Sequence, residues 1–181
     1  MSWNIDSAHS EIQFVARHMM ISKVHGQFEK FSGTVNYVED NPTNTTVEIH
    51  IESNSVNTRE VKRDAHLRSA DFFNADVYPT MTFKSSRVEL LDPQHAHLIG
   101  DLTIRDVTRQ LTLDVEHFGT VKDPWGLISA GFGATTKINR KDWGLTWNMA
   151  MESGGILVGD EVEINIELEL IKQPETQPAA S

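Results

Sequence analysis

The sequence predicts an all-β protein, a single antiparallel barrel of about eight strands with one short helical crossover. Three observations lead to this prediction. Apolar and polar residues alternate strictly in many segments, as they do in strands that bury one face. These segments are joined by short polar turns, so consecutive strands can pair antiparallel. One stretch, residues 57–78, lacks the alternation and clusters its charges.

The alternation divides the chain into eight expected strands. Its clearest example lies near the C-terminus, where Val162, Ile164, Ile166, Leu168 and Leu170 alternate with Glu and Asn. In chain order the expected strands are Glu11–Met20, Phe28–Val38, Val47–Ile51, Thr80–Leu91, Ala96–Ile104, Gln110–Phe118, Ile128–Arg140 and Glu161–Leu170. A barrel is favoured over a two-sheet sandwich because strands of this length leave long exposed edges unless the sheet closes on itself.

The stretch Asn57–Tyr78 is expected to form the helical crossover. Asn57 or Thr58 can cap a short helix, Ser69 can cap a second turn, and the next residue after the stretch, a proline, restarts extended chain. Residues 1–172 are expected to form one barrel domain. The tail 173–181 has no apolar periodicity and is expected to be disordered.

An eight-stranded barrel can either fill with its own side chains or hold one small ligand. Small residues recur along the expected strands and favour a hollow interior. They are Ala16, Ala96, Gly100, Gly131 and Gly133. The alternative is that the glycines sit at corners of a packed barrel, which would then serve as an interaction module.

The composition excludes several classes of function. The net charge of -10 and pI of about 5.2 disfavour nucleic acid and anionic lipid headgroups as main partners. The absence of cysteine excludes a thiol nucleophile, a disulfide framework and thiolate-bound metal. No apolar run is long enough to span a bilayer, so stable membrane insertion is not expected. The N-terminus lacks signal-peptide features, so we expect a cytoplasmic protein, or a periplasmic one if a leader was removed.

Common catalytic motifs are missing, and an enzyme is not expected. There is no nucleophile elbow, no HExxH pattern and no phosphate loop. The alternative is a lipid- or amide-modifying enzyme that uses His18, His66 and Asp64 for acid–base work. His95 and His97 could chelate a metal from one strand face, but no third ligand follows at a suitable spacing. Neither a metal nor a required cofactor is therefore predicted.

Two groups of residues are candidate ligand contacts. His18 ends the inward-facing series that contains Phe14 and could contact a ligand headgroup or be a hydrogen-bonded core histidine. The crossover holds a cationic cluster followed by two phenylalanines. Together these residues could form a lip over the barrel opening, or the cluster could belong to an ordinary solvated helix. The cluster comprises Arg59, Lys62, Arg63, His66 and Arg68. The full set of predicted contacts is Phe14, His18, Arg63, His66, Phe72, Phe73, Phe83 and Trp143.

Five motifs resemble the YceI-like family. They are W-x-I-D-x-x-H-S at Trp3–Ser10, H-G-Q-F at His25–Phe28, R-D-x-H-L-x-S-x-D-F-F-x-A-x-x-Y-P at Arg63–Pro79, G-D-L-T-I-x-D-V-T at Gly100–Thr108 and A-x-x-x-I-N-R-x-D-W-G at Ala134–Gly144. The resemblance implies a lipocalin-like barrel with a helix near one end. It also implies that a long isoprenoid chain, such as a polyprenyl phosphate or a quinone, binds inside as cargo of a carrier or sequestering protein. A homodimer is a further expectation from this resemblance.

Overall fold

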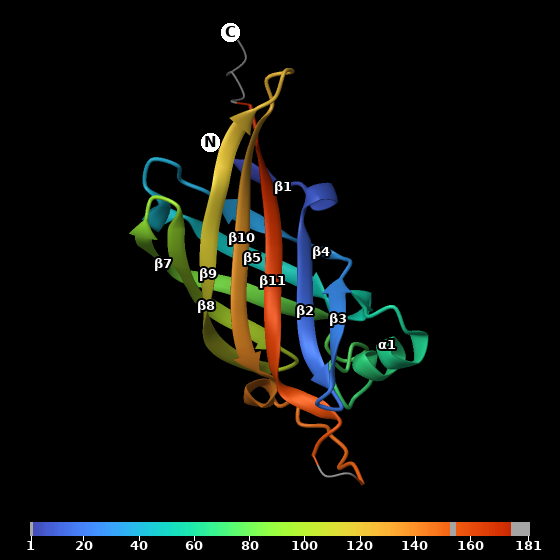
Figure 1. Ribbon diagram of the computed structural model, residues 1–181. Helices are drawn as coiled ribbons and strands as arrows, with labels where there is room; N and C mark the ends of the chain where they lie inside the picture. The colour runs from blue at the N-terminus through green and yellow to red at the C-terminus, as the bar shows by residue number, and fades with distance from the viewer. Residues whose placement is uncertain (1, 153–154, 175–181) are drawn as a thin grey trace.

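The computed structural model describes residues 2–152 and 155–174, and its regular structure is almost entirely β (Figure 1). The strands are β1 (Trp3–Ile5), β2 (Glu11–His18), β3 (Ser22–Phe28), β4 (Phe31–Asn36), β5 (Thr46–Glu52), β6 (Val56–Asn57), β7 (Thr80–Asp92), β8 (His95–Ile104), β9 (Val107–Lys122), β10 (Ile128–Asn139) and β11 (Val158–Lys172). The helix α1 spans Val61–Arg68, and short 3-10 helices are η1 (Ser7–His9), η2 (Pro42–Asn44), η3 (Ser53–Ser55) and η4 (Arg140–Trp143).

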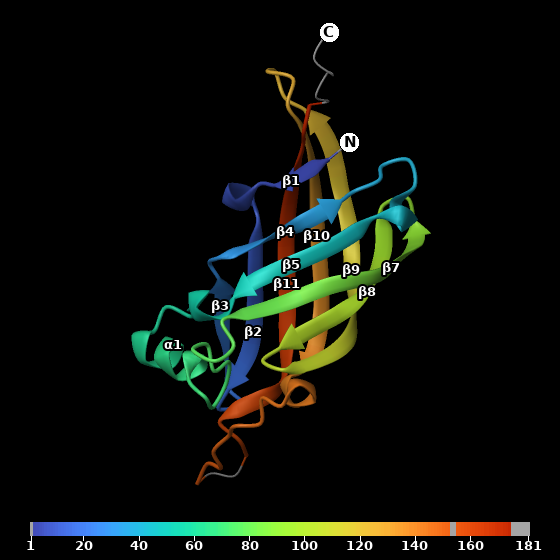
Figure 2. The ribbon, with the colours of Figure 1, turned by 180° about the vertical axis from the view of Figure 1, so that it is seen from behind.

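The sheet closes into a barrel of eight antiparallel strands. The order is β1-β4-β5-β7-β8-β9-β10-β11, and β1 pairs with β11 to complete the ring. Both β1 and β2 lie along the same edge of β11, with η1 between them, and β3 and β6 continue the wall beyond β2. Figures 1 and 2 show β9, β10, β11 and β2 along the long axis on one side and β4, β5, β7 and β8 crossing behind them. The predicted closed barrel with a short helical crossover is confirmed.

Each of the eight expected strands corresponds to an observed strand. Three further strands escaped the sequence analysis because they are short or mostly polar: β1 has three residues, β6 has two, and β3 reads SKVHGQF. The chain bends at Glu29–Lys30, so Phe28 ends β3 instead of beginning β4. At such bends a strand changes its neighbour, which alternation within a single strand does not reveal.

The crossover contains α1, but its N-cap differs from the prediction. Glu60 is the N-cap, and its carboxylate accepts hydrogen bonds from the backbone N–H groups of Lys62 and Arg63. Asn57 belongs to β6, and the hydroxyl of Thr58 donates to the Asp64 carboxylate. Thr58 is therefore occupied with a side chain inside the helix and does not cap it. Ser69 is the C-cap of α1, and its hydroxyl accepts a hydrogen bond from the N–H of Asp71 in the turn that follows, as predicted.

Apolar side chains from all sides of the barrel meet in its interior. A large cluster includes Ile12, Phe83, Leu102 and Leu113, and a smaller one at the other end holds Trp3, Val35, Ala130 and Leu170. Within residues 2–152 and 155–174, no helix is long and apolar enough to cross a membrane. The tail predicted to be disordered falls, from residue 175 onward, outside the described residues.

Candidate ligand-binding cavity

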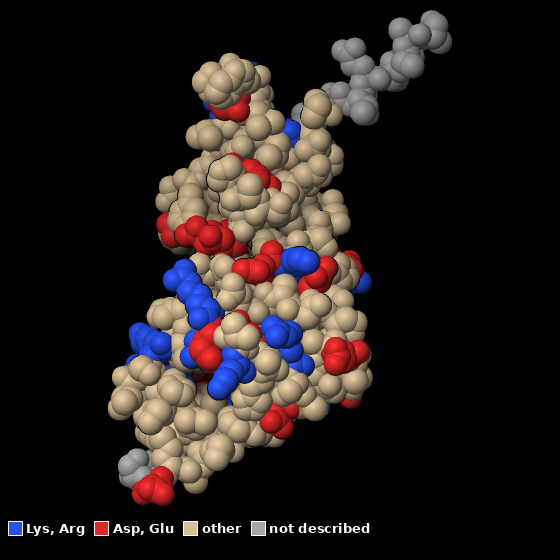
Figure 3. Space-filling view, turned by 90° about the vertical axis from the view of Figure 1, so that its right-hand side faces the viewer, with Lys and Arg blue, Asp and Glu red and all other residues tan. Residues whose placement is uncertain are grey.

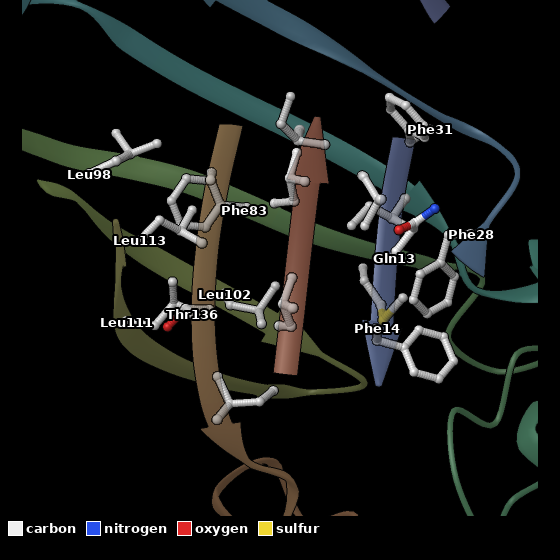
Figure 4. Close-up of a pocket in the computed structure, with 18 of the residues that line it drawn as sticks. Gln13, Phe14, Phe28, Phe31, Phe83, Leu98, Leu102, Leu111, Leu113 and Thr136 are labelled. Carbon is white, nitrogen blue, oxygen red and sulfur yellow. The ribbon is translucent and has the colours of Figure 1, made fainter. Parts of the chain in front are cut away.

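A cavity of about 310 Å³ lies inside the barrel. Its wall includes side chains from one end of the barrel to the other, from Tyr37 and Leu168 at the end that holds β1 to Phe72 and Leu145 near α1 and η4. Figure 4 shows Phe14, Phe28, Phe83, Leu98, Leu102, Leu111 and Leu113 converging on this space from different strands. The surface that the wall offers is apolar. The volume lies at the lower end of the range of about 300–1,000 Å³ usual for ligand sites.

The alternation seen in the sequence produces this wall. Along β10 and β11 the inward positions face each other in register, Ala134 opposite Ile166 and Thr136 opposite Ile164. All four residues line the cavity, whereas the intervening Glu163 does not. Because side chains on a strand point alternately to the two faces, each inward apolar residue leaves a polar neighbour outside.

Some of the small residues predicted to widen the interior do line the cavity, but others do not. Ala16 and Ala96 line the cavity, as expected. At Gly133 the missing Cβ would lie 2.7 Å from Cζ of Phe118, an exposed ring on the outer face. A Cβ on Gly131 would approach the same side chain, so both glycines accommodate an external ring, and Gly133 also borders the cavity, as expected, whereas Gly131 does not. The inward small residue on β10 is Ala134.

Two other glycines hold aromatic rings against the wall. A Cβ on Gly26 would clash with Cζ of Phe14, its direct cross-strand partner. A Cβ on Gly100 would lie 2.6 Å from Cζ of Phe83. Each ring therefore occupies the place of the absent side chain, since glycine in a strand permits such close approach. This packing sets both rings close to the backbone of the neighbouring strand, where they form part of the cavity wall.

Four of the eight predicted contact residues line the cavity: Phe14, Phe72, Phe73 and Phe83. Phe28, which the sequence analysis did not single out, lies between Phe14 and Phe73, with ring centroids 5.5 and 5.6 Å away. The alternating pattern of β3 is too weak in apolar residues to assign Phe28 to the interior. Contact of any of these residues with a ligand stays a prediction.

The crossover borders one end of the cavity, and we call this border the lid. Leu67 of α1 and the following Phe72 and Phe73 face the lumen. His66 packs edge-on against Trp147 at 4.5 Å and against Phe72 at 5.1 Å, which ties α1 to the segment after η4. The lid is thus held by aromatic packing between two segments far apart in the sequence.

The other four predicted contact residues do not line the cavity. Nε and Nη2 of Arg63 donate to the hydroxyl and carbonyl oxygens of Thr58, both at 2.8 Å, so this cation braces the turn before α1. Trp143 is buried outside the lumen, and its Nε1–H donates to the carbonyl of Leu102 at 2.8 Å. Alternation gives the direction of a side chain from the strand, but it does not show where the cavity ends.

The two remaining histidines lie outside the lumen as well, and the acid–base set of the enzyme alternative is not assembled. His18 lies at the end of β2, opposite Ser22 of β3. His66 pairs with Asp71, 2.9 Å from Nε2 to Oδ2, whereas Asp64 accepts hydrogen bonds from Thr58. His66 and Asp64 have different partners, and His18 lies on β2 outside the crossover, so the three form no shared site.

The histidines considered as metal ligands are paired with carboxylates. His95 lies 2.8 Å from Asp92, and Nε2 of His97 lies 3.2 Å from Oδ1 of Asp114. Among the described residues, a potential metal-ligand trio occurs instead at Asp6, His9 and Glu169. The Asp6 carboxylate there caps η1 and hydrogen-bonds His9, which raises the pKa of His9. Capping accounts for these contacts without a metal.

Arg140 is a buried cation at the α1 end of the cavity that the sequence analysis did not select. Its guanidinium donates to the backbone carbonyls of Leu145, Val158 and Gly159, and it lies 3.8 Å from Asp160. Burial lowers the pKa of Arg140, and the Asp160 carboxylate opposes this shift. The signal was present in the alternation, because Arg140 continues the inward-facing series of β10. Its carbonyl contacts make it a brace between η4 and β11.

Comparison with known proteins identifies the family. The model of the YceI-like domain matches residues 3–170. The chain belongs to the YceI-like family. A UPF0312 protein of Staphylococcus aureus is 34% identical to this YceI-like chain over 169 residues, which cover 93% of the chain and 96% of that relative. The resemblance inferred from the five motifs is confirmed.

Solved structures place the same fold in other YceI-like proteins and more distant ones. The Campylobacter jejuni YCEI protein is 31% identical, with a TM-score of 0.77 over 87% of this chain and 90% of the other. BcnA of Burkholderia cenocepacia is 22% identical, with a TM-score of 0.80 over 92% and 99%. A polyisoprenoid binding domain from Saccharophagus degradans, implicated in plant cell wall breakdown, is 17% identical, with a TM-score of 0.66 over 94% and 98%.

Proposed function

We propose that this YceI-like protein binds a long apolar lipid of the isoprenoid type inside the barrel, as a carrier or sequestering protein and not as an enzyme. The observation that carries the proposal is the apolar cavity of about 310 Å³ that follows the barrel interior. A hydrocarbon chain is the ligand that such a wall accommodates without leaving polar groups unpaired. The description of the Saccharophagus degradans domain as polyisoprenoid binding supports the same class of ligand.

The size of the cavity sets the expected affinity. A methylene group takes up about 30 Å³, close to the volume of a water molecule, so the cavity holds on the order of ten chain carbons. Their burial, at about 0.8 kcal/mol each, provides on the order of 8 kcal/mol, which corresponds to roughly micromolar binding. A longer tail would extend beyond the cavity as it stands. Binding should therefore depend on the presence of an apolar chain more than on its headgroup, so polyisoprenoids, quinones and polyprenyl phosphates all qualify.

The same wall argues against catalysis in the lumen. Acid–base chemistry needs a titratable side chain within reach of the bound molecule. The titratable lining residues are Tyr37, whose pKa is raised by burial, and Arg140, whose guanidinium donors point to backbone carbonyls. His18, His66 and Asp64 lie outside the lining. We accordingly propose that no metal or cofactor is required, and that the lipid is the bound molecule.

Lipid extraction tests the proposal. The protein is purified without detergent, extracted with organic solvent, and the extract is analysed by mass spectrometry. We expect about one long-chain lipid per polypeptide. The stripped protein should then take up an added isoprenoid, measured by tryptophan fluorescence. A folded protein that carries no lipid and takes up no chain of any kind would falsify the proposal.

A further inference from the structure

One end of the barrel carries exposed apolar side chains. The turn between β2 and β3 presents Met19, Met20 and Ile21, which are 41%, 61% and 82% exposed. The segment after η4 presents Met149 and Ile156 beside it, at 58% and 36% exposure. The backbone N–H of Met19 donates to the carbonyl of Leu157 at 2.8 Å, which joins the two segments. We call these five exposed residues the apolar tip.

The β2–β3 turn is chemically unusual for its shape. Met19 and Met20 have φ values of 54° and 61°, and the N–H of Ile21 donates to the carbonyl of His18. Two successive positive φ values are those of a type I′ turn, where Asn-Gly is strongly preferred. Methionine gains no local advantage here and exposes an apolar chain to water. The sulfur of Met20 lies over Gly155 of the neighbouring segment, yet much of Met19 and Met20 stays exposed, so packing within the described chain buries neither side chain.

Positive charge surrounds the apolar tip although the whole chain is acidic. The four segments at this end, residues 15–25, 57–79, 103–110 and 137–161, hold eleven of the 16 Lys and Arg residues but nine of the 26 acidic ones. The net charge of this end is therefore +2, and the rest of the chain carries -12. Figure 3 shows Lys and Arg gathered on the lower half of the α1 side.

Several of these cations are free to meet an external anion. Arg17 and Lys23 are direct cross-strand partners, and like charges in that position destabilise a sheet. Among the described residues, none of Arg17, Lys23 and Lys62 forms an ion pair within 4.0 Å. By contrast, the Glu60 carboxylate of the adjacent crossover caps α1.

We propose that the apolar tip docks the protein onto an anionic lipid bilayer, with these cations at the level of the headgroups. Arg17 and Lys23 each lie two residues along a strand from the turn, which is about 7 Å at roughly 3.3 Å per residue. Interfacial segments bury their apolar face by about 5–10 Å, with basic residues above it. The lid formed by α1, Phe72 and Phe73 lies at this same end, so docking would bring the cavity to its source of lipid.

Vesicle flotation tests the docking on the full chain without added cargo. The vesicles are phosphatidylcholine alone and phosphatidylcholine with about 30 mol % phosphatidylglycerol. We expect binding to the anionic vesicles alone, with release at roughly 0.5 M NaCl because salt screens the attraction. Equal binding to both vesicle types, or binding to neither, overturns the proposal.

Variants locate the contact. Replacing Met19-Met20 by Asn-Gly should leave the melting temperature equal or higher, because the new pair suits the turn, while binding weakens by about tenfold or more. Lys23→Gln should weaken binding by about fivefold. Trp125→Ser is the matched control, since Trp125 is 89% exposed at the opposite end and should not matter. Loss of binding in Trp125→Ser, with full binding by the Asn-Gly variant, refutes docking through the apolar tip.

The lipid content of each variant separates docking from cargo binding. The Asn-Gly variant should still take up an isoprenoid from detergent solution at the wild-type level, because neither Met19 nor Met20 lines the cavity. A protein that docks but holds no chain contradicts the proposed function and leaves docking standing. A protein that holds a chain but does not bind vesicles contradicts the docking proposal and leaves the proposed function standing.

Discussion

Filling the cavity from inside is the most direct test of its role in binding. Ala134 lies on β10 with its side chain in the lumen, opposite Ile166 of β11. Ala134→Phe adds six carbon atoms to a space that holds on the order of ten, at about 30 Å³ each. The lost burial of six chain carbons, at about 0.8 kcal/mol each, is about 5 kcal/mol. The dissociation constant for an isoprenoid should therefore rise by roughly three orders of magnitude.

The assay compares this variant with one that carries the same ring outside. Thr135 follows Ala134 and is exposed on the outer face, so Thr135→Phe controls for the added aromatic residue. Both proteins are stripped of lipid and titrated with an isoprenoid, and their unfolding is followed by circular dichroism. Overpacking is expected to lower the free energy of unfolding of Ala134→Phe by about 1–3 kcal/mol, which a folded barrel can tolerate. Equal dissociation constants in the two folded variants would refute binding in the lumen.

Three further predictions concern stability. Gly100→Ala should lower the free energy of unfolding by about 1–3 kcal/mol in urea titrations, because its Cβ would lie 2.6 Å from the Phe83 ring; an unchanged midpoint contradicts this packing. Trp143→Phe should lower the free energy of unfolding by about 1–2 kcal/mol, because the hydrogen bond to the carbonyl of Leu102 is lost. An unchanged free energy of unfolding would show that this bond is dispensable. The Asp6 carboxylate raises the pKa of His9 above 6.5, so this contact stabilises the fold at pH values below 6.5 and its contribution is lost as the pH rises through the higher folded value. The difference in melting temperature between wild type and His9→Gln should accordingly shrink as the pH is raised from about 5.5 to about 8, the range in which histidine titrates. A constant difference argues against the pairing of His9 with Asp6.

Much of the wall could be predicted from the sequence because strand geometry is local. The alternation from Val162 to Leu170 sets which side chains of β11 face inward, and all five of these apolar residues line the cavity, beside Ile12 and Phe14 of β2. The same rule placed Phe83 in the interior. Phe72 and Phe73 followed from the break in alternation, since a non-strand crossover between barrel strands must cover an opening.

Predictions about polar groups were less successful, because a hydrogen-bond partner depends on tertiary contacts. Arg63 and His66 were expected at the lip, yet Arg63 braces Thr58 and His66 packs on Trp147, a residue 81 positions later in the chain. Arg140 was not selected, although its position in the inward-facing series of β10 could have identified it. Trp143 belongs to a recognisable motif, but only the folded chain shows that its indole reaches the carbonyl of Leu102.

By itself, the sequence determined the barrel, the number of its long strands, the position of the crossover and the apolar character of the interior. These follow from the two-residue period of a strand and from the cost of leaving sheet edges open. The tertiary structure alone decided which glycines face inward, how long the lumen is, and that exposed methionines and most of the cations share one end of an acidic molecule. Those features depend on register and on contacts between distant segments, which no local pattern encodes.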